Sequence, residues 1–201
     1  MPESQSNNIA AADSFYAIRQ TLKGKFNLQQ TGHIDFNLQQ FEVFKHCHAI
    51  ELQSSYVIKT DGNSSYILFV ETHCKAEYKA GITDTYDHQT WALAYLKHNF
   101  GRVLIRPETL RDKIVELIHP LEIDFAEDKA FSDTFYVVAN DHEKAVTGIN
   151  RNLRNAVMDV REDDFIIEIV DHTLIIGSKK TITPEAAVHL AQFVSRVAEM
   201  C

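Results

Sequence analysis

The chain has 201 residues, of which 45% are hydrophobic, and a formal net charge of -8 at pH 7. This length and composition are typical of one globular domain, or of two small ones, with a core of ordinary size. The acidic balance disfavours nucleic acid and anionic membrane surfaces, because the phosphates of both would repel the protein. We therefore expect no nucleic-acid partner and no membrane partner.

The N-terminal residues and the cysteines set the expected compartment. Residues 1–12 contain no basic stretch followed by an apolar core, and no later window approaches 18 uninterrupted apolar residues. Neither a signal peptide nor a spanning helix is therefore predicted. The three cysteines, Cys47, Cys74 and Cys201, are odd in number and form no C-x-x-C pair, which favours reduced thiols. The sequence predicts a cytoplasmic protein without a structural disulfide.

The first half of the chain predicts one helix followed by an antiparallel meander. Residues 1–12 are small and polar, and we expect them to be disordered. Asp13 or Ser14 can cap a helix that Gly24 ends. Period-two alternation of apolar residues then replaces helical spacing. It covers residues 34–38, 41–49, 56–59 and 66–78.

The pair Asp61-Gly62 is the best hairpin signal, because it suits a turn that needs positive φ. We expect the strands on its two sides, 55–59 and 65–70, to pair. Farther on, residues 91–97 permit a helix, and a polar gap at residues 83–88 marks the predicted boundary between two halves.

The second half of the chain predicts the order β-α-β-β-α-β-β-α. A short strand precedes a helix that Pro107 begins and Pro120 ends, and Thr183 caps the closing helix. The other expected elements are strands at 121–125, 135–138, 165–170 and 173–176 and a helix at 141–157, which Asn140 or Asp141 caps. This is the order of a split βαβ, ferredoxin-like layer with an added edge strand and a closing helix. The alternative is one mixed sheet that continues between the halves.

The sequence thus predicts an α+β fold in three parts. These are a disordered N-terminus at residues 1–12, a helix plus antiparallel meander at residues 13–88, and an α+β half at residues 89–201. The last two parts could also form one continuous domain.

A resemblance accompanies this order. Phe131-Ser-Asp-Thr-Phe135-Tyr-Val137 precedes Asn140-Asp141, and the hairpin Ile167-Glu-Ile-Val-Asp-His-Thr-Leu-Ile175 follows farther on. This half resembles the C-terminal half of a group of uncharacterised bacterial proteins catalogued as domains of unknown function. In that group a similar Phe-x-x-x-Phe-x-Val strand precedes a helix and a late hairpin. Members often carry hydrophobic N-terminal anchors, which we do not expect here. The resemblance implies a bacterial protein and transfers no activity and no functional residues.

The histidines are the most chemically suggestive residues. On a strand, His46 and His48 point to one face and Cys47 points to the other. If the hairpin keeps its register, His48 approaches His73, and the three histidines could hold zinc or another divalent ion. The alternative is a set of half-exposed strand residues in a chain with ten histidines, because no standard ligand spacing is present. We expect no cofactor.

A second candidate site lies at the first strand-to-helix turn of the second half. Arg102, Arg106 and Glu108 cluster there, and a helix N-terminus can hold an anion. Backbone N–H groups would bind a phosphate or carboxylate, and the guanidinium of Arg102 or Arg106 would add a bidentate pair of hydrogen bonds. The alternative is a solvated helix start, because no glycine-rich loop precedes it.

The closing helix is apolar over much of its circumference. Its candidate contact residues are Leu190, Phe193, Val197 and Met200. Such a helix is covered on more than one side, so we expect a symmetric homodimer through these residues. The alternative is that the helix at residues 15–22 covers them within one chain.

No catalytic motif accompanies this secondary structure. We therefore favour a non-enzymatic binding or protein-interaction module, chaperone-like or adaptor-like, that acts on a protein partner or on itself. The alternative is a small-molecule-dependent or metal-dependent enzyme whose site lies between the two halves.

Overall fold

The computed structural model describes residues 3–59, 64–78, 81–108 and 121–200, except for the side chains of 3–12, 76–78 and 81–83. The strands are β1 (Leu28–Gln30), β2 (Cys47–Ile58), β3 (Ser65–Tyr78), β4 (Gly81–Tyr95), β5 (Arg102–Pro107), β6 (Leu121–Glu122), β7 (Phe135–Ala139), β8 (Ile166–Val170) and β9 (Thr173–Gly177). They form one sheet in the order β1-β2-β3-β4-β9-β8-β5-β7-β6, and all the pairs are antiparallel. This sheet and its helices confirm the predicted α+β class.

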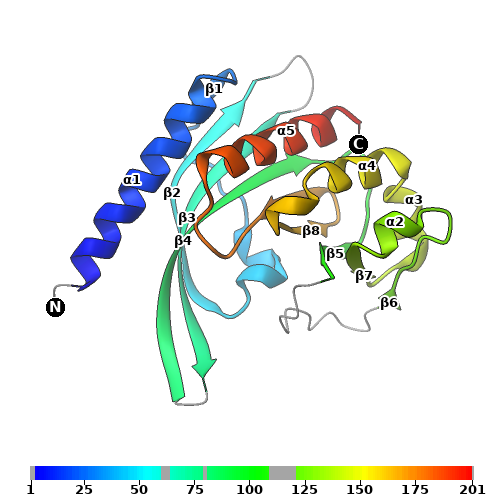
Figure 1. Ribbon diagram of the computed structural model, residues 1–201, viewed down its shortest axis with the longest axis horizontal. Coiled ribbons are helices and arrows are strands. Elements are labelled where there is room, and N and C mark those ends of the chain that lie inside the picture. The colour runs from blue at the N-terminus through cyan, green and yellow to red at the C-terminus, as the bar shows by residue number, and fades with distance from the viewer. Residues whose placement is uncertain (1–2, 60–63, 79–80, 109–120, 201) are drawn as a thin grey trace.

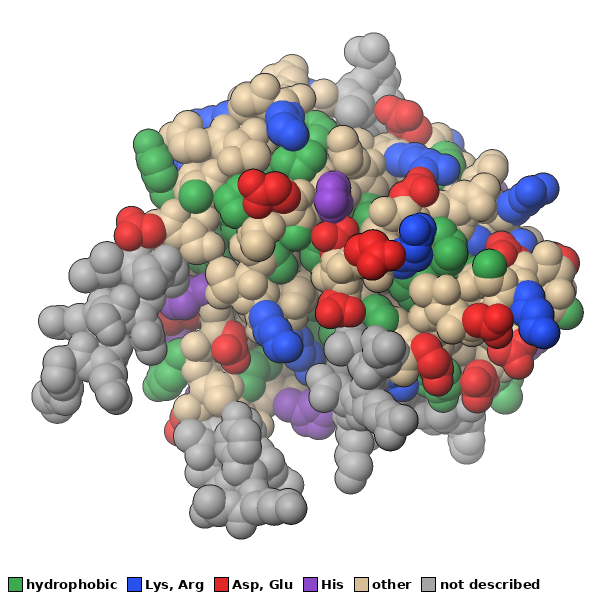
Figure 2. Space-filling view, viewed as in Figure 1, with side chains coloured by type: hydrophobic (Ala, Val, Ile, Leu, Met, Phe, Trp, Pro, Cys, Tyr) green, Lys and Arg blue, Asp and Glu red, His purple; other side chains and the backbone are tan. Residues whose placement is uncertain are grey.

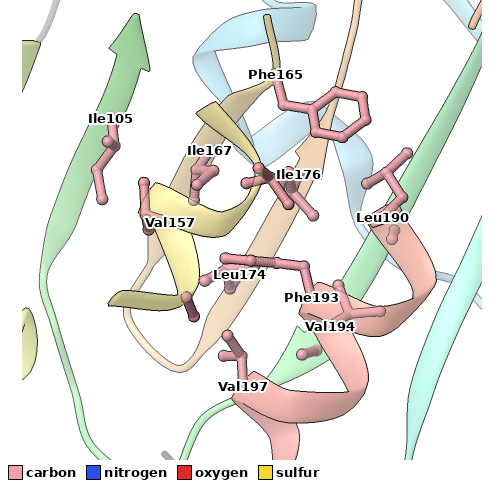
Figure 3. Packing of buried hydrophobic residues seen from close by; sticks show 14 of the residues in the cluster. Ile105, Val157, Phe165, Ile167, Leu174, Ile176, Leu190, Phe193, Val194 and Val197 are labelled. Atoms are coloured by element: carbon pink, nitrogen blue, oxygen red, sulfur yellow. The ribbon is translucent and has the colours of Figure 1, made fainter. Parts of the chain in front are cut away.

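Helices cover one face of this sheet (Figure 1). They are α1 (Glu3–Lys23), α2 (Lys129–Ser132), α3 (His142–Gly148), α4 (Arg151–Asp159) and α5 (Pro184–Met200). The helix α5 contacts α1 and α4 as well as β3, β4 and β9. Figure 3 shows Phe193 and Val197 of α5 and Val157 of α4 beside Leu174 and Ile176 of β9. All five are buried, and each contributes about 1.5–3 kcal/mol on leaving water.

The other face is covered by a chain segment that we call the strap, residues 31–46. It contains two short 3-10 turns, η1 (Leu38–Gln40) and η2 (Glu42–Phe44). The strap buries Phe36, Leu38, Phe41, Val43 and Phe44 in a second core with strand residues that include Leu68, Trp91, Leu104 and Ile175. The Phe44 ring meets the Trp91 ring edge-on, with the centroids 5.2 Å apart.

One buried carboxylate holds the strap against the sheet. Glu168 of β8 is 2% exposed and accepts hydrogen bonds from the backbone N–H groups of Glu42, at 2.7 Å, and Val43, at 3.1 Å. These are first-turn N–H groups of η2, which have no acceptor inside their own helix. Burial raises the pKa of Glu168 to about 7, although the two N–H donors and Arg102 lower it.

The strap replaces two strands that the sequence predicts. Residues 34–38 and much of 41–49 alternate as strands do, but the structure places them in irregular chain and 3-10 turns. Asn37 adopts a φ of 48°, which breaks an extended chain, and asparagine is one of the few residues that tolerate this conformation. The alternation of apolar residues correctly predicted that one side of this segment is apolar, but it predicted the wrong backbone conformation.

The predicted helix at residues 91–97 is also wrong, because Trp91 lies in β4. The polar gap at residues 83–88, predicted as a boundary, lies within the same strand. Trp91 and Leu93 face the strap core, whereas Ala92 and Ala94 face the helix core. A strand that is buried on both faces has no alternation, so its pattern cannot be told from that of a buried helix.

Some of the predicted helix boundaries are wrong, and one is confirmed. The helix α1 begins at Glu3, so the predicted cap at Asp13 or Ser14 is wrong. The single helix expected at residues 141–157 is two helices, and Asn150 caps the second by accepting from Asn152 N and Leu153 N. Asp141 caps α3, as predicted.

The last third of the chain follows local signals closely. Thr183 accepts a hydrogen bond from Ala186 N at 3.2 Å, which confirms it as the cap of α5. The hairpin turn at Asp171-His172 joins β8 to β9, and Asp171 takes a φ of 53°. The strand β9 is not an edge strand, since it pairs with both β8 and β4.

Two expectations fall on residues that the structure does not describe. The turn residues Asp61 and Gly62 are among them, although the flanking strands pair as predicted, with Ile58 opposite Ser65. The predicted helix start at Pro107 is wrong, because Pro107 is the last residue of β5 and pairs with Phe135. The rest of the helix expected up to Pro120 falls within residues 109–120, which are also outside the described residues. The strands around it lie in the order β8-β5-β7-β6, and the ferredoxin-like unit remains a prediction.

The raised pKa of Glu168 predicts that folding stability depends on pH. Because the pKa is raised from 4.5 to about 7, the folded protein holds a proton that the unfolded chain releases between these values. This contribution to stability is complete below pH 4.5 and is lost as the pH rises through 7. The free energy of unfolding, measured relative to the Glu168→Gln variant by urea denaturation, should fall by on the order of 3 kcal/mol across this range.

The matched control is Glu122→Gln, at an exposed carboxylate on β6. Relative to this variant, the wild-type stability should show no comparable fall. A difference between wild type and Glu168→Gln that stays constant from pH 4.5 to pH 7 would show that Glu168 is not held in a desolvated site.

Candidate functional site

The outer edge of β2 is the first feature that can bind another molecule. The strand β1 pairs with Tyr56–Ile58, and Thr31 N donates to Ser55 O. Among the described residues, no strand pairs with the rest of β2 on this side. We call residues 47–54 the β2 edge. A row of N–H and C=O groups without strand partners is a template for an added strand.

Two irregularities limit the β2 edge. The register with β3 shifts between Cys47 and Ala49 and again between Leu52 and Ser54. These shifts have the form of β-bulges, which bend a strand and end regular pairing. The regular part of the edge is therefore Ala49–Leu52.

A cavity of about 360 Å³ lies beside this edge, and we call it the edge pocket. Ile34, Phe36 and Leu38 of the strap line it, together with Ile50 and Leu52 of β2. Leu52 is 36% exposed, which is high for a large apolar side chain in a strand. The polar strap residues His33, Asp35, Asn37 and Gln39 also line it, so the edge pocket offers a mixed apolar and polar surface next to the open backbone groups.

The opposite face of the β2 edge is acidic. Glu51 is exposed and lies opposite Glu71 of β3. The Glu71 carboxylate accepts from Gln53 Nε2 at 3.2 Å and lies 3.1 Å from His73 Nε2. Between Phe26 and Ile58 the sequence has no arginine and one lysine, Lys45, which is already paired with Glu42.

The structure brings two of the three histidines of the predicted metal site together. The rings of His48 and His73 are 6.1 Å apart between centroids, whereas His46 precedes β2. The bulge at position 48 places Ala49, rather than residue 50, opposite His73. The described part of the chain holds no group of three His, Cys, Asp or Glu residues that could bind a metal ion.

The prediction of three free cysteines is wrong. Cys47 and Cys74 form a disulfide between β2 and β3. The same bulge places Cys47 directly opposite Cys74, and sequence spacing alone cannot show such a register shift. The cysteine argument for a reducing compartment therefore no longer holds.

The two arginines of the predicted anion site make contacts within the chain. Arg102 Nη1 donates to Gln40 O of the strap at 3.0 Å. The Arg106 guanidinium lies 4.5 Å from the centre of the Tyr136 ring. Glu108 N donates to Thr134 O, and the helix that would supply further N–H groups is outside the described residues. Anion binding remains a prediction.

The predicted dimer residues are covered within one chain. Leu190 and Val197 are fully buried, Phe193 is 3% exposed, and Met200 is half-buried. The helix α1 packs against α5, which is the intramolecular alternative that the sequence left open. The apolar width of α5 therefore does not require a second copy, and the homodimer remains a prediction.

A second cavity has a volume of about 620 Å³. We call it the end cavity. The loop residues His98 and Phe100, the helix residues Asp141 and Lys144, and Met200 at the end of α5 are among those that line it. It lies within the second half of the chain, not between the halves where the sequence placed an enzyme site.

Hydrogen bonds fix the loop that lines the end cavity. Asn99 Oδ1 accepts from Gly101 N at 2.8 Å, and Gly101 takes a φ of 68° that favours glycine. Lys144 Nζ lies 3.4 Å from Asp141 Oδ2. The N–H group of Lys144 is the main cause of the lowered pKa of Asp141. This carboxylate acts as a helix cap, and its arrangement is not that of a general base.

Among the described residues, the helix-covered surface carries side chains of both charges. Figure 2 shows acidic and basic side chains interspersed over the face that α4 and α5 form. In the described residues, no helix is both long enough and apolar enough to cross a membrane.

Comparison with known proteins gives a likeness of fold. No family model matches this chain, and no curated protein matches it in sequence. The crystal structure of the mycobacterial trehalose monomycolate transport factor A, TtfA, is similar to it with a TM-score of 0.62 and 9% sequence identity. The alignment covers 92% of each chain, so the likeness extends over almost the whole fold.

The wall of the end cavity predicts a steric effect at Gly148. A Cβ atom built there would lie 2.3 Å from the buried Phe100 ring. We expect Gly148→Ala to lower the free energy of unfolding by about 1–3 kcal/mol, because the ring must move in a packed core. Gly32→Ala is the control, since its added Cβ meets nothing within 4 Å, and urea denaturation compares the two. Equal stabilities would contradict the contact.

The disulfide predicts the number of reactive thiols. In the absence of reductant, iodoacetamide should label one cysteine per unfolded chain, and after reduction it should label three. Mass spectrometry of the alkylated protein counts the labels. Three labels on protein that was purified without reductant and unfolded before labelling would contradict the Cys47–Cys74 bond.

Proposed function

We propose that this protein is a non-catalytic binding module, of the chaperone or adaptor type, that holds an extended segment of a partner protein at the β2 edge. The observation that carries this proposal is the open edge of β2 with a pocket beside it, in which Leu52 is an exposed apolar side chain. In strand addition, main-chain hydrogen bonds supply affinity, and pockets for alternate side chains supply specificity. Both parts are present around Ala49–Leu52.

The likeness to TtfA supports the coarser part of this proposal. That protein is described as a transport factor, which is a binding or transport role. At 9% identity the two chains share a fold, and what TtfA transports is not carried over to this chain. A shared fold does not by itself imply a function, so the β2 edge, and not the likeness, carries the proposal.

The end cavity favours a second candidate function, the binding of a small molecule. Its volume of about 620 Å³ lies within the range of roughly 300–1,000 Å³ that is usual for ligand sites. Asp141 and Lys144 in its wall are paired with each other, and His98 and Glu143 also line it, so the cavity offers polar groups that could bind a small molecule. A cytoplasmic location and a homodimer are further expectations, and the thiol count bears on the first of them.

The proposed function predicts that peptide binding depends on Leu52. An unbiased library of short peptides displayed on phage should yield binders to the wild-type protein. The Leu52→Lys variant should bind them at least tenfold more weakly, because a charge then lies at the mouth of the edge pocket. Fluorescence polarisation with the selected peptides measures this loss.

Leu121→Lys is the matched control. Leu121 is 49% exposed on β6, at the opposite edge of the same sheet, so the variant makes the same change of charge and polarity elsewhere. It should bind the selected peptides as the wild type does. If no peptide is selected, or if Leu52→Lys binds as tightly as Leu121→Lys, the β2 edge is not the binding site.

A further inference from the structure

We propose that the segment held at the β2 edge alternates apolar with basic side chains. This inference rests on the proposed function and adds to it the chemistry of the partner. It follows from the difference between the two faces of the sheet along the regular part of the edge, Ala49–Leu52.

The geometry of the sheet separates the two sets of side chains. Ile50 and Leu52 lie opposite Thr72 and Val70 of β3, on the face that the strap covers. Successive side chains of a strand point to opposite faces, so Glu51 lies on the other face. An added strand has the same alternation. Every second side chain of the segment would therefore meet the edge pocket, and the others would lie beside Glu51.

The apolar half of the pattern follows from the edge pocket. Ile34, Phe36 and Leu38 of the strap are among its lining residues, and Leu52, which also lines it, is 36% exposed. An aliphatic side chain placed there would remove apolar surface of both partners from water. An acidic side chain in the same place would lose hydration and would lie near Asp35, a carboxylate in the lining of the pocket.

The basic half follows from charge complementarity. Glu51 is exposed, and the Glu71 side chain one strand inward is 20% exposed. Lys45 lies in the strap, on the other face, and is paired with Glu42. On the face of Glu51, the Arg19 guanidinium of α1 lies over the Tyr16 ring and donates to Tyr56 Oη at 3.5 Å. Opposite charges on neighbouring strands attract, and like charges directly opposite each other repel. Lysine or arginine side chains on this face would supply the missing positive charge.

The same carboxylates disfavour a second copy of this chain at the edge. Two β2 edges brought side by side would place Glu51 and Glu71 of one chain near those of the other. Natural sheets use charged edges to prevent such pairing. The two register shifts act in the same direction, because they shorten the regular edge to Ala49–Leu52. The segment that fits is therefore a short one from a different protein.

The test compares three peptides of equal length, in which valine alternates with lysine, with glutamine or with glutamate. Binding to the full chain is measured by fluorescence polarisation at low salt and pH 8. His48, His73 and Glu71 neighbour the edge, so all three peptides are compared at this one pH. The lysine peptide should bind about tenfold more tightly than the glutamate peptide, with the glutamine peptide between them.

Two variants separate local from overall attraction. Glu51→Lys should reverse the order of the lysine and glutamate peptides. Glu122→Lys makes the same change in net charge on β6, at the other edge of the sheet, and should keep the wild-type order. Equal binding of the three peptides, or equal effects of the two variants, would overturn the inference.

Failure of the inference can be told from failure of the proposed function. Library-selected peptides that depend on Leu52 but lack alternating basic residues would overturn the inference and leave the β2 edge as a binding site. If neither the designed nor the library peptides bind, the inference and the proposed function are both contradicted. A doubled mass in light scattering that Leu52→Lys returns to that of one chain would make a second copy the occupant and would also overturn the inference.

Discussion

A carboxylate buried in the middle of the sheet determines how the second face of this fold is covered. Glu168 lies in a strand whose other residues, Ile166, Ile167, Ile169 and Val170, are apolar and buried. A buried charge is costly unless it is well bonded, and Glu168 is bonded to two N–H groups of η2. Because η2 is held there, the strap lies across the strands instead of leaving them exposed. The edge pocket exists because the strap then runs beside β2, so the candidate site depends on this interaction.

A second buried charged group, the guanidinium of Arg154, is stabilised in a different way from Glu168. Arg154 of α4 is 5% exposed, and its guanidinium pairs with Asp128 at 2.8 Å and with Glu127 at 3.1 Å. It also donates to Ile149 O and lies over the Phe125 ring. Arg154 therefore keeps a charged partner, whereas the direct partners of Glu168 are backbone groups. Without a charged group as a direct partner, the carboxyl group of Glu168 has its pKa raised to about 7, chiefly by burial.

The sequence predicted those parts of the fold that local signals determine. The caps at Asp141 and Thr183 and the turn at Asp171-His172 depend on a few neighbouring residues, and the structure confirms all three. The predictions for the strap and for β4 were wrong because distant segments of the chain set the environment of both. An alternating run such as 34–38 fits a strap as well as a strand, and a strand buried on both faces has no alternation.

The candidate site was harder to predict than the fold. An open edge is a property of the whole strand order, which no stretch of β2 contains in itself. The bulge that brings Cys47 opposite Cys74 and sets Ala49 opposite His73 is equally invisible in spacing. Two features of the sequence nevertheless point to the site. Lys45 is the one lysine or arginine between Phe26 and Ile58, which indicates that the region around β2 has few positive charges. One glutamate interrupts the apolar run Phe165-Ile-Ile-Glu-Ile-Val170, which indicates a buried carboxylate.

Amide hydrogen exchange, followed by NMR with and without the peptide that alternates valine and lysine, tests the central claim most directly. If a segment adds to the β2 edge, backbone N–H groups at every second residue of Ala49–Leu52 become hydrogen-bonded, and their exchange slows when the peptide binds. The account predicts this alternating protection, with no change around the end cavity at His98 and Lys144. Protection at the end cavity, with exchange along Ala49–Leu52 unaltered, would contradict it.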